Sequence, residues 1–345
     1  MPKNEEECIE SYPLPDFKNL NGKNILITGG AGFIGSHLAE QILKLKAGSV
    51  RVLDNLSTGK LQNLNHLRVY GNFEFVKGDI FNYTQCEEAC TGINYVLHQA
   101  ALGSVPRSFE NPLATHAANS DGFLNMICAA NEKKVEKFIF ASSSSVYGDQ
   151  TANPKQEGSE GNLLSPYAIS KKTNELYATL LAAHFNMHIL GFRYFNVFGE
   201  RQDPNGPYAA VIPKFMAACL DNQPATLYGD GKTSRDFTYV GNIVYANLLA
   251  LQNNQNTSSG SILNLGCGGS TSLLELLKMI AQVNHSISIP PTFKESRKGD
   301  IRDSQANIEK AEKILNYKPI FNLQYGLERT LRFYKKSHND LKISK

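Results

Sequence analysis

The chain has 345 residues, of which 41% are apolar and 19% are charged, and its formal net charge is +3. These values are ordinary for a folded protein with one large domain or two domains that share a core, and they exclude an extended disordered chain. The small net charge predicts that the protein binds neither nucleic acid nor a membrane surface. No apolar run is as long as the roughly 20 residues that span a membrane, which predicts a cytoplasmic protein.

From Lys23 onward, short apolar strands alternate with helical stretches, after an N-terminal extension over residues 1–22. Strands are predicted at 24–28, 49–53, 73–77, 95–98, 137–141 and 188–192, and helices from the glycine-rich turn through Leu45, at 115–132 and at 167–185. This alternation is typical of a doubly wound, mostly parallel Rossmann sheet with helices on both faces.

After Gly199 the alternation becomes irregular, and proline-containing loops separate the helices. We therefore expect a dinucleotide-binding domain at 23–198 and a smaller α/β substrate-binding domain at 199–235 and 266–345. The segments 236–240 and 262–265 look like strands that return to the first domain, so about 236–265 is assigned to it. The six cysteines include no CxxC pair and no histidine at a zinc-ligand spacing, which predicts free thiols and no metal site.

The first predicted strand runs into the glycine-rich turn Gly29-Gly30-Ala31-Gly32-Phe33-Ile34-Gly35. Gly29, Gly32 and Gly35 form GxxGxxG, a spacing variant of the dinucleotide fingerprint, and the following helix would present free N–H groups to phosphates. Asp54 ends the second strand, where a carboxylate can accept both ribose hydroxyls and would repel a 2′-phosphate. The pattern predicts NAD binding in preference to NADP, and the alternative is a purely structural turn.

Tyr167 and Lys171 are four residues apart on a helix predicted to begin at Ser165 and Pro166, so both side chains leave the same face. A tyrosine is a poor base at neutral pH because its pKa lies near 10, but a lysine ammonium and the positive nicotinamide of NAD⁺ would stabilise the phenolate. The spacing alone also suits a packed tyrosine beside a surface lysine. The serines at 142–145 end the preceding strand, where ligands bind in open α/β sheets.

Five segments together carry a family resemblance: TGGAGFIG (28–35), HQAA (98–101), VYGD (146–149), SPYAISK (165–171) and RYFNVFG (193–199). With them the chain resembles the extended short-chain dehydrogenase/reductase superfamily over nearly its whole length. Within that superfamily it is most similar to the nucleotide-sugar 4-epimerases, especially the UDP-N-acetylglucosamine 4-epimerases. This resemblance implies an NAD-dependent isomerase that is a homodimer, formed through helices near 115–132 and 167–185.

The resemblance also implies a mechanism. Ser143 would hydrogen-bond the sugar 4-hydroxyl with Ser144 beside it, and Tyr167 would remove the hydroxyl proton while the C4 hydride passes to NAD⁺. The 4-ketose would turn and take the hydride back on its other face, so NAD would stay bound. Relatives that dehydrate or decarboxylate carry carboxyl groups where this chain has Ser144 and Ser145, which argues against a 4,6-dehydratase.

By matching position, the resemblance and the glycine turn assign two sets of binding residues. The cofactor set is Gly29, Gly32, Phe33, Ile34, Gly35, Asp54, Asn55, Asp79, Ile80, Gln99, Ala100, Ala101, Asn119, Ser142, Tyr167, Lys171 and Tyr194. The substrate set is Gly103, Ser104, Ser143, Ser144, Tyr167, Asn196, Gln202, Ala210, Tyr228, Arg235, Arg302 and Ser304.

Some of these assignments have alternatives. Asp79 would bracket the adenine with Ile80, or it caps its own loop. Arg235 and Arg302 would hold the diphosphate, or they form surface ion pairs with Asp236 or Asp300. Tyr228 would stack on uracil.

Substrate choice depends on the position of Ser304. Galactose epimerases that resist N-acetyl sugars carry a bulky tyrosine there, and serine would leave room for a 2-acetamido group. The resemblance therefore favours UDP-N-acetylglucosamine and UDP-N-acetylgalactosamine. The alternative substrates are UDP-glucose and UDP-hexuronic acids, whose carboxylate Arg107 could bind. The alternative functions are a net-oxidising dehydrogenase and a catalytically silent NAD-binding sensor.

Overall fold

The computed structural model describes residues 13–15, 17, 20–204, 209–253, 259–286, 289–295 and 301–343, with side chains described up to residue 336. Most of the predicted N-terminal extension, residues 1–12, lies outside these residues.

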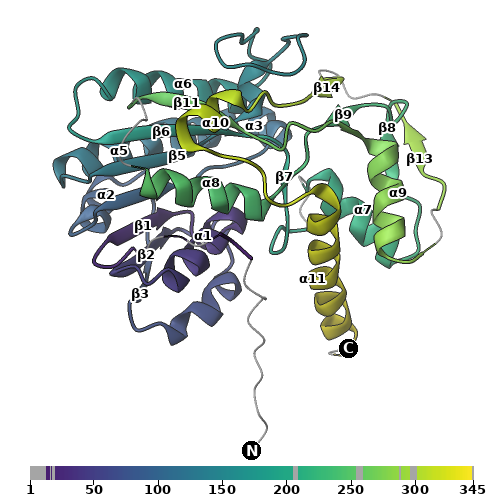
Figure 1. Ribbon diagram of the computed structural model, residues 1–345, viewed down its shortest axis with the longest axis horizontal. Helices are drawn as coiled ribbons and strands as arrows, with labels where there is room; N and C mark the ends of the chain where they lie inside the picture. The colour runs from purple at the N-terminus through teal and green to yellow at the C-terminus, as the bar shows by residue number, and fades with distance from the viewer. Residues whose placement is uncertain are drawn as a thin grey trace, which may run out of the picture.

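The described part of the chain is built around a seven-stranded parallel sheet in the order β11-β6-β5-β4-β1-β2-β3 (Figure 1). Its strands are β1 (Asn24–Thr28), β2 (Ser49–Asp54), β3 (Phe73–Lys77), β4 (Tyr95–His98), β5 (Lys137–Ser143), β6 (His188–Tyr194) and β11 (Ser261–Leu265). The predicted Rossmann-type sheet is therefore confirmed. Parallel strands with both faces covered are apolar along their length, which is why these segments stood out in the sequence.

Helices cover both faces of this sheet. On one face lie α1 (Phe33–Lys44) and α8 (Val240–Gln252), and on the other lie α2 (Tyr83–Cys90), α5 (Gly122–Glu132) and α6 (Pro166–Leu181). The pleat of β1 separates the two cores: Ile25 and Ile27 join the cluster that contains Leu38 of α1, whereas Leu26 joins the cluster that contains Phe123 of α5.

Several predicted elements differ in extent or place from the structure. The helix expected at 115–132 is divided into α4 (Pro112–His116), a π-helical turn η2 (Ala117–Asp121) and α5. The strand expected at 236–240 shortens to β10 (Thr238–Tyr239), which pairs with β7 (Val197–Phe198) outside the main sheet. Strands β5 and β6 run two residues further than predicted because they pair as far as Ser143 and Tyr194.

The rest of the chain forms a smaller part beside the carboxyl ends of the main strands (Figure 1). It contains the helices α7 (Val211–Leu220), α9 (Leu273–Val283) and α11 (Leu323–Ile343). It also contains two small sheets: the pair of β8 (Thr226–Tyr228) and β13 (Thr292–Lys294), and the three strands β12 (Thr271–Ser272), β9 (Ser234–Arg235) and β14 (Asp303–Ser304). The remaining short helices are α3 (Val105–Glu110), α10 (Glu309–Leu315) and the 3₁₀ turns η1 (Leu61–Val69) and η3 (Ser144–Tyr147).

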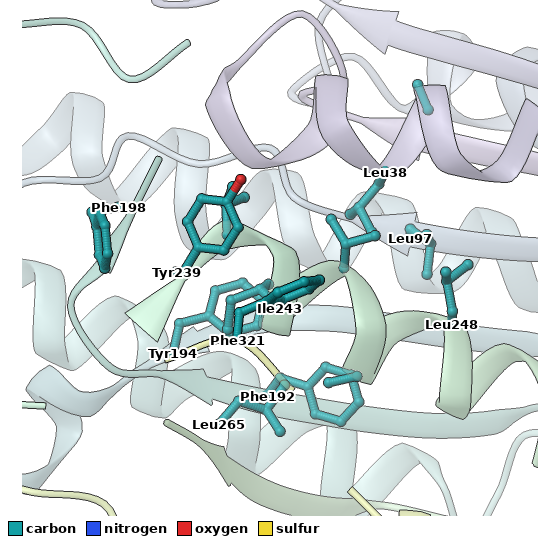
Figure 2. Packing of buried hydrophobic residues seen from close by; sticks show 14 of the residues in the cluster. Leu38, Leu97, Phe192, Tyr194, Phe198, Tyr239, Ile243, Leu248, Leu265 and Phe321 are labelled. Carbon is teal, nitrogen blue, oxygen red and sulfur yellow. The ribbon is translucent and has the colours of Figure 1, made fainter. Parts of the chain in front are cut away.

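One hydrophobic core joins the two parts. The Tyr239 ring packs against Phe198 and Phe321, with ring centroids 5.9 and 5.6 Å apart, close to Ile243 of α8 (Figure 2). All four side chains belong to the same buried cluster as Leu38 of α1. Because this core is shared, the two walls of the cleft between the parts are held in a fixed relation.

Candidate active site

A cavity of about 410 Å³ opens at the carboxyl edge of the main sheet, where the strand order reverses between β1 and β4. Such a switch point is the usual ligand site of open α/β sheets. Every residue of the predicted cofactor set lines this cavity except Asn119.

The glycine turn leaves no space for side chains at two positions. A Cβ on Gly29, whose φ is +65°, would lie 2.7 Å from the backbone of Ala100 at the end of β4. A Cβ on Gly35 would lie 2.4 Å from the carbonyl oxygen of Gly29. The first glycine thus allows the turn to approach β4, and the last allows α1 to begin directly against the turn.

Asp54 is buried behind this turn. Its carboxylate accepts the N–H of Ala31 at 2.9 Å and the N–H of Leu56 at 2.8 Å. Burial raises the pKa of Asp54, and these two backbone donors oppose the rise. The carboxylate is held by two fixed bonds and keeps further lone pairs, which fits a ligand with two ribose hydroxyls.

Gln99 supplies a second sign of a polar ligand. Its Oε1 accepts from the Tyr194 hydroxyl at 3.2 Å, and Asn247 donates to the same hydroxyl at 3.0 Å. Its Nε2 is buried and has no hydrogen-bond partner among the described residues. An unpaired buried donor is costly, so this amide fits a site completed by an acceptor on a bound dinucleotide.

Asp79 and Asn119, both predicted to bind the cofactor, make hydrogen bonds within the protein. Asp79 accepts from Phe81 N and Asn55 Nδ2, each at 2.9 Å, as a residue that caps its own loop does. It also lines the cleft, and its contact with an adenine stays a prediction. The structure does not bring Asn119 into the cleft wall. Its amide is used by the backbone of Leu102 and by Ser170, and the neighbouring Ala118 lines the cavity instead.

Tyr167 and Lys171 enter the cleft from the first turns of α6. The helix starts where predicted: Ser165 accepts from Ala168 N at 3.1 Å, and Pro166 occupies the first turn. The Lys171 ammonium donates to Ala141 O at 2.8 Å and lies 6.0 Å from the centre of the Tyr167 ring.

The protonation of this pair follows from its surroundings. Burial raises the pKa of Tyr167, and a hydrogen bond with Ser143 opposes that rise. Burial lowers the pKa of Lys171 to about 8, against the opposing influence of Glu175. Tyr167 therefore needs additional positive charge before it can act as a base at neutral pH.

A larger cavity of about 880 Å³ continues from the dinucleotide cleft, and Ser143, Tyr167, Tyr194, Gly103 and Val197 line both. Its walls also include Ser104, Ser144, Asn196 and Ala210 from the predicted substrate set. A third cavity of about 460 Å³ holds Tyr228 and Arg235 and shares Asn196 with the second. The three cavities form a continuous path along the molecule because each shares residues with the next.

Three predicted substrate residues line neither of these two substrate cavities. Arg302 has an exposed side chain, and its carbonyl oxygen accepts from Ser234 N at 2.9 Å and from the Arg235 guanidinium at 3.1 Å. Ser304 is buried in β14. Gln202 donates to Val197 O at 3.2 Å. The carboxylate of Asp236 accepts hydrogen bonds from the backbone N–H groups of Cys267 and Gly268. Asp300, the other predicted ion-pair partner of these arginines, lies outside the described residues.

Other lining residues were not predicted. Lys214 of α7 and Lys294 of β13 line the cavity of Tyr228 and Arg235, and Ser57 and Thr58 line the dinucleotide cleft. Ser57 and Thr58 follow Asp54 closely and could have been inferred from that position. The two lysines belong to no motif, and Lys294 reaches this cavity because the pairing of β13 with β8 places it beside Tyr228.

Among the described residues, no three His, Cys, Asp or Glu side chains are grouped so as to hold a metal ion. Within the same residues, no helix has both the length and the apolar character needed to cross a membrane.

Comparisons with known proteins agree with this geometry. Residues 25–266 match the NAD dependent epimerase/dehydratase family. A UDP-glucose 4-epimerase of Mycolicibacterium smegmatis is 34% identical over 90% of this chain and 98% of its own length. The UDP-N-acetylglucosamine 4-epimerase of Methanobrevibacter ruminantium, solved with UDP-N-acetylmuramic acid, is 36% identical with a TM-score of 0.86, over 93% of this chain and 100% of that one.

A UDP-glucuronic acid 4-epimerase of Bacillus cereus, solved with UDP-glucuronic acid and NAD, is 30% identical with a TM-score of 0.84, over 91% of this chain and 99% of that one. The chain therefore belongs to the NAD dependent epimerase/dehydratase family. It is an enzyme of the nucleotide-sugar epimerase type, and its cofactor is NAD.

Proposed function

We propose that this enzyme interconverts UDP-N-acetylglucosamine and UDP-N-acetylgalactosamine by epimerisation at C4. The observation that carries the proposal is the position of Ser143 and Tyr167 in the wall shared by the dinucleotide cleft and the larger cavity. A sugar carbon bound at that wall would face the cofactor and the candidate base together.

In the proposed reaction, Tyr167 takes the proton of the sugar 4-hydroxyl while Ser143 holds that hydroxyl by a hydrogen bond. The Lys171 ammonium stabilises the phenolate form of Tyr167. The chemistry that NAD supplies when bound is reversible acceptance of the C4 hydride. The 4-ketose turns within the 880 Å³ cavity and is reduced on its other face, with Tyr167 returning the proton.

The nucleotide half of the substrate would occupy the cavity of Tyr228 and Arg235. Tyr228 offers a ring for the uracil, and Arg235 offers a guanidinium for the diphosphate. Lys214 lines both this cavity and the sugar cavity, so it is placed to contact the diphosphate that would join the two halves. These cations support a nucleoside diphosphate sugar as the substrate class.

The walls of the sugar cavity support an N-acetyl sugar. Gly103, Ser104, Ser144 and Ala210 have small side chains, which leave space for a 2-acetamido group. Ser304 carries less of this argument than the sequence suggested, because it is buried in β14 away from the cavity wall. The proposal therefore depends on the group of small residues.

Arg107, the residue that could meet a uronic acid, lines a different cavity beside Gly32, Phe33 and Lys60. Glu110, one turn further on the same helix, lines the sugar cavity and would repel a carboxylate. Both observations favour a neutral sugar over a uronic acid.

The working form is proposed to be a homodimer. Large apolar side chains are exposed on three helices that pack together, namely Phe109 on α3, Leu113 on α4, and Ile169, Leu176 and Leu180 on α6. An apolar face of this kind on a folded chain is typical of a protein interface. A second copy would cover it by pairing the same helices across a twofold axis.

The test is incubation of the purified enzyme with UDP-N-acetylglucosamine alone, followed by proton NMR of the sugar and by absorbance at 340 nm. We expect UDP-N-acetylgalactosamine to appear up to a fixed ratio with no lasting NADH signal. Turnover of UDP-glucose or a UDP-uronic acid instead would refute the N-acetyl assignment alone. If no UDP-sugar reacts even with added NAD, the epimerase proposal is wrong, and a silent NAD-binding sensor becomes the better account.

A further inference from the structure

Glu175 is a buried carboxylate one helical turn beyond Lys171 on α6, with 2% of its surface exposed. It accepts hydrogen bonds from Ser142 Oγ at 2.6 Å and from Arg193 Nε and Nη2 at 2.8 Å each. A carboxylate removed from water in this way is tolerated only with such donors, and the forked guanidinium fits it with two parallel bonds.

The donors to Glu175 come from the two strands that deliver active-site residues. Ser142 lies on β5 directly before Ser143, and Arg193 lies on β6 directly before Tyr194. Ser142 and Arg193 are also direct partners across the β5–β6 ladder. One carboxylate therefore joins α6 to both strand ends at the point where they form the wall of the cleft.

Glu175 also faces the charge of Lys171. Residues four apart share a helix face, and Lys171 is itself buried and hydrogen-bonded to Ala141 O. Burial lowers the pKa of Lys171, and the negative charge of Glu175 raises it. If Lys171 lost its proton, it could no longer stabilise the Tyr167 phenolate.

Other charged and titratable groups surround Glu175 and Lys171. Lys172 lies 3.4 Å from both Glu175 and Glu160, and Glu160 forms a second ion pair with Arg193. On the β4 side, burial and, to a smaller extent, the charge of Lys171 together lower the pKa of His98 to about 3, so this ring stays neutral over the working pH range. The Arg193 guanidinium lies over the Tyr147 ring, with its carbon 4.8 Å from the ring centre.

We propose that Glu175 is a positioning residue of this enzyme: it fixes Tyr167 and Lys171 against the ends of β5 and β6 and balances the charge of the Lys171 ammonium. The kinetic part of its test rests on the proposed function, whereas the structural and electrostatic part does not. Glu160 offers a matched control, because it is the other carboxylate on Arg193 but lies outside the pair formed by Glu175 and Lys171.

The direct test is NMR titration of the enzyme labelled with ¹³C at lysine Cε, with the Lys171 signal assigned by its loss in Lys171→Met. We expect Glu175→Gln to lower the pKa of Lys171 by about one unit and Glu160→Gln to leave it unchanged. This measurement needs no substrate. A Lys171 pKa that is unchanged in Glu175→Gln, or shifted equally in Glu160→Gln, would overturn the electrostatic role.

The kinetic test is the pH dependence of kcat with whichever UDP-sugar the wild-type enzyme converts. In Glu175→Gln we expect the alkaline fall of kcat to begin about one pH unit lower, with KM within about twofold of wild type. Glu175→Asp keeps the charge but shortens the reach to Ser142 and Arg193, so it should lose kcat without moving the alkaline limb.

The aspartate variant also serves if Glu175→Gln does not fold. Unchanged kcat in Glu175→Asp would overturn the positioning role, because the shortened side chain cannot keep both contacts. A wild-type enzyme that converts no UDP-sugar would refute the proposed function. The NMR result would still decide whether Glu175 controls Lys171.

Discussion

Replacement of Tyr167 by phenylalanine separates catalysis from structure more cleanly than any other change in the site. The substitution removes one hydroxyl, whose partner in the protein is Ser143. The net contribution of such a hydrogen bond to stability is about 1 kcal/mol, which corresponds to a Tm change of only about 1.5 °C in a chain of this size. Loss of a general base costs about 10³-fold in rate, or about 4 kcal/mol of transition-state stabilisation.

The assay is kcat for UDP-N-acetylglucosamine epimerisation, with bound NAD measured after acid release and Tm measured in parallel. We expect kcat to fall about 10³-fold in Tyr167→Phe while NAD content stays at the wild-type value. Tyr177→Phe is the matched control, because Tyr177 lies on the same helix, is 38% exposed and lines none of the cavities described above. A Tyr167→Phe enzyme that keeps more than about a tenth of wild-type kcat would refute Tyr167 as the base.

Three further predictions test the cofactor turn, the sugar cavity and the dimer. Gly35→Ala places a Cβ 2.4 Å from a backbone oxygen, so it should weaken NAD binding at least about tenfold by calorimetry, whereas Gly71→Ala, with open space around it, should not. Ala210→Phe should lower kcat/KM for UDP-N-acetylglucosamine about tenfold more than for UDP-glucose, and an equal loss would contradict an acetamido group at that wall. Leu180→Glu should halve the mass measured by light scattering, whereas Val69→Glu, also exposed but on η1, should leave it unchanged.

The sequence predicted the main sheet well because buried parallel strands are marked by their own composition. All six strands predicted between residues 24 and 192 are present in this sheet, and 262–265 was also recognised as a returning strand. The errors lie where pairing decides the outcome. Residues 236–240 read as a strand, but the segment pairs with the short β7 and continues into α8 at Val240.

The lining of the candidate cofactor cleft could be predicted because its residues lie at strand ends and in one continuous turn. The lining of the candidate substrate cavities was harder to predict. Lys214 on α7 and Lys294 on β13 line the same cavity, but they are distant in sequence, and β13 is placed there by its pairing with β8. Asn119 is a residue that was assigned to the cofactor set but does not line the cleft. The motif placed it near the cofactor, but its amide is used by Leu102 and Ser170, a contact that becomes visible only when the 102 loop meets α6.

The first half of α6 combines several of these functions at one regular spacing. Tyr167, Lys171 and Glu175 follow each other at four-residue intervals, so successive side chains leave nearly the same face of the helix. Along that face a proton-transfer group is followed by a positive charge and then by a negative charge that is bound to two strands. The first two residues were predicted from their chemistry, whereas Glu175 was not, because in sequence it resembles a solvated helical glutamate. Its burial follows from the Ser142–Arg193 pair across the sheet, and that pairing turns an ordinary i,i+4 spacing into a link between the proposed base and the sheet edge.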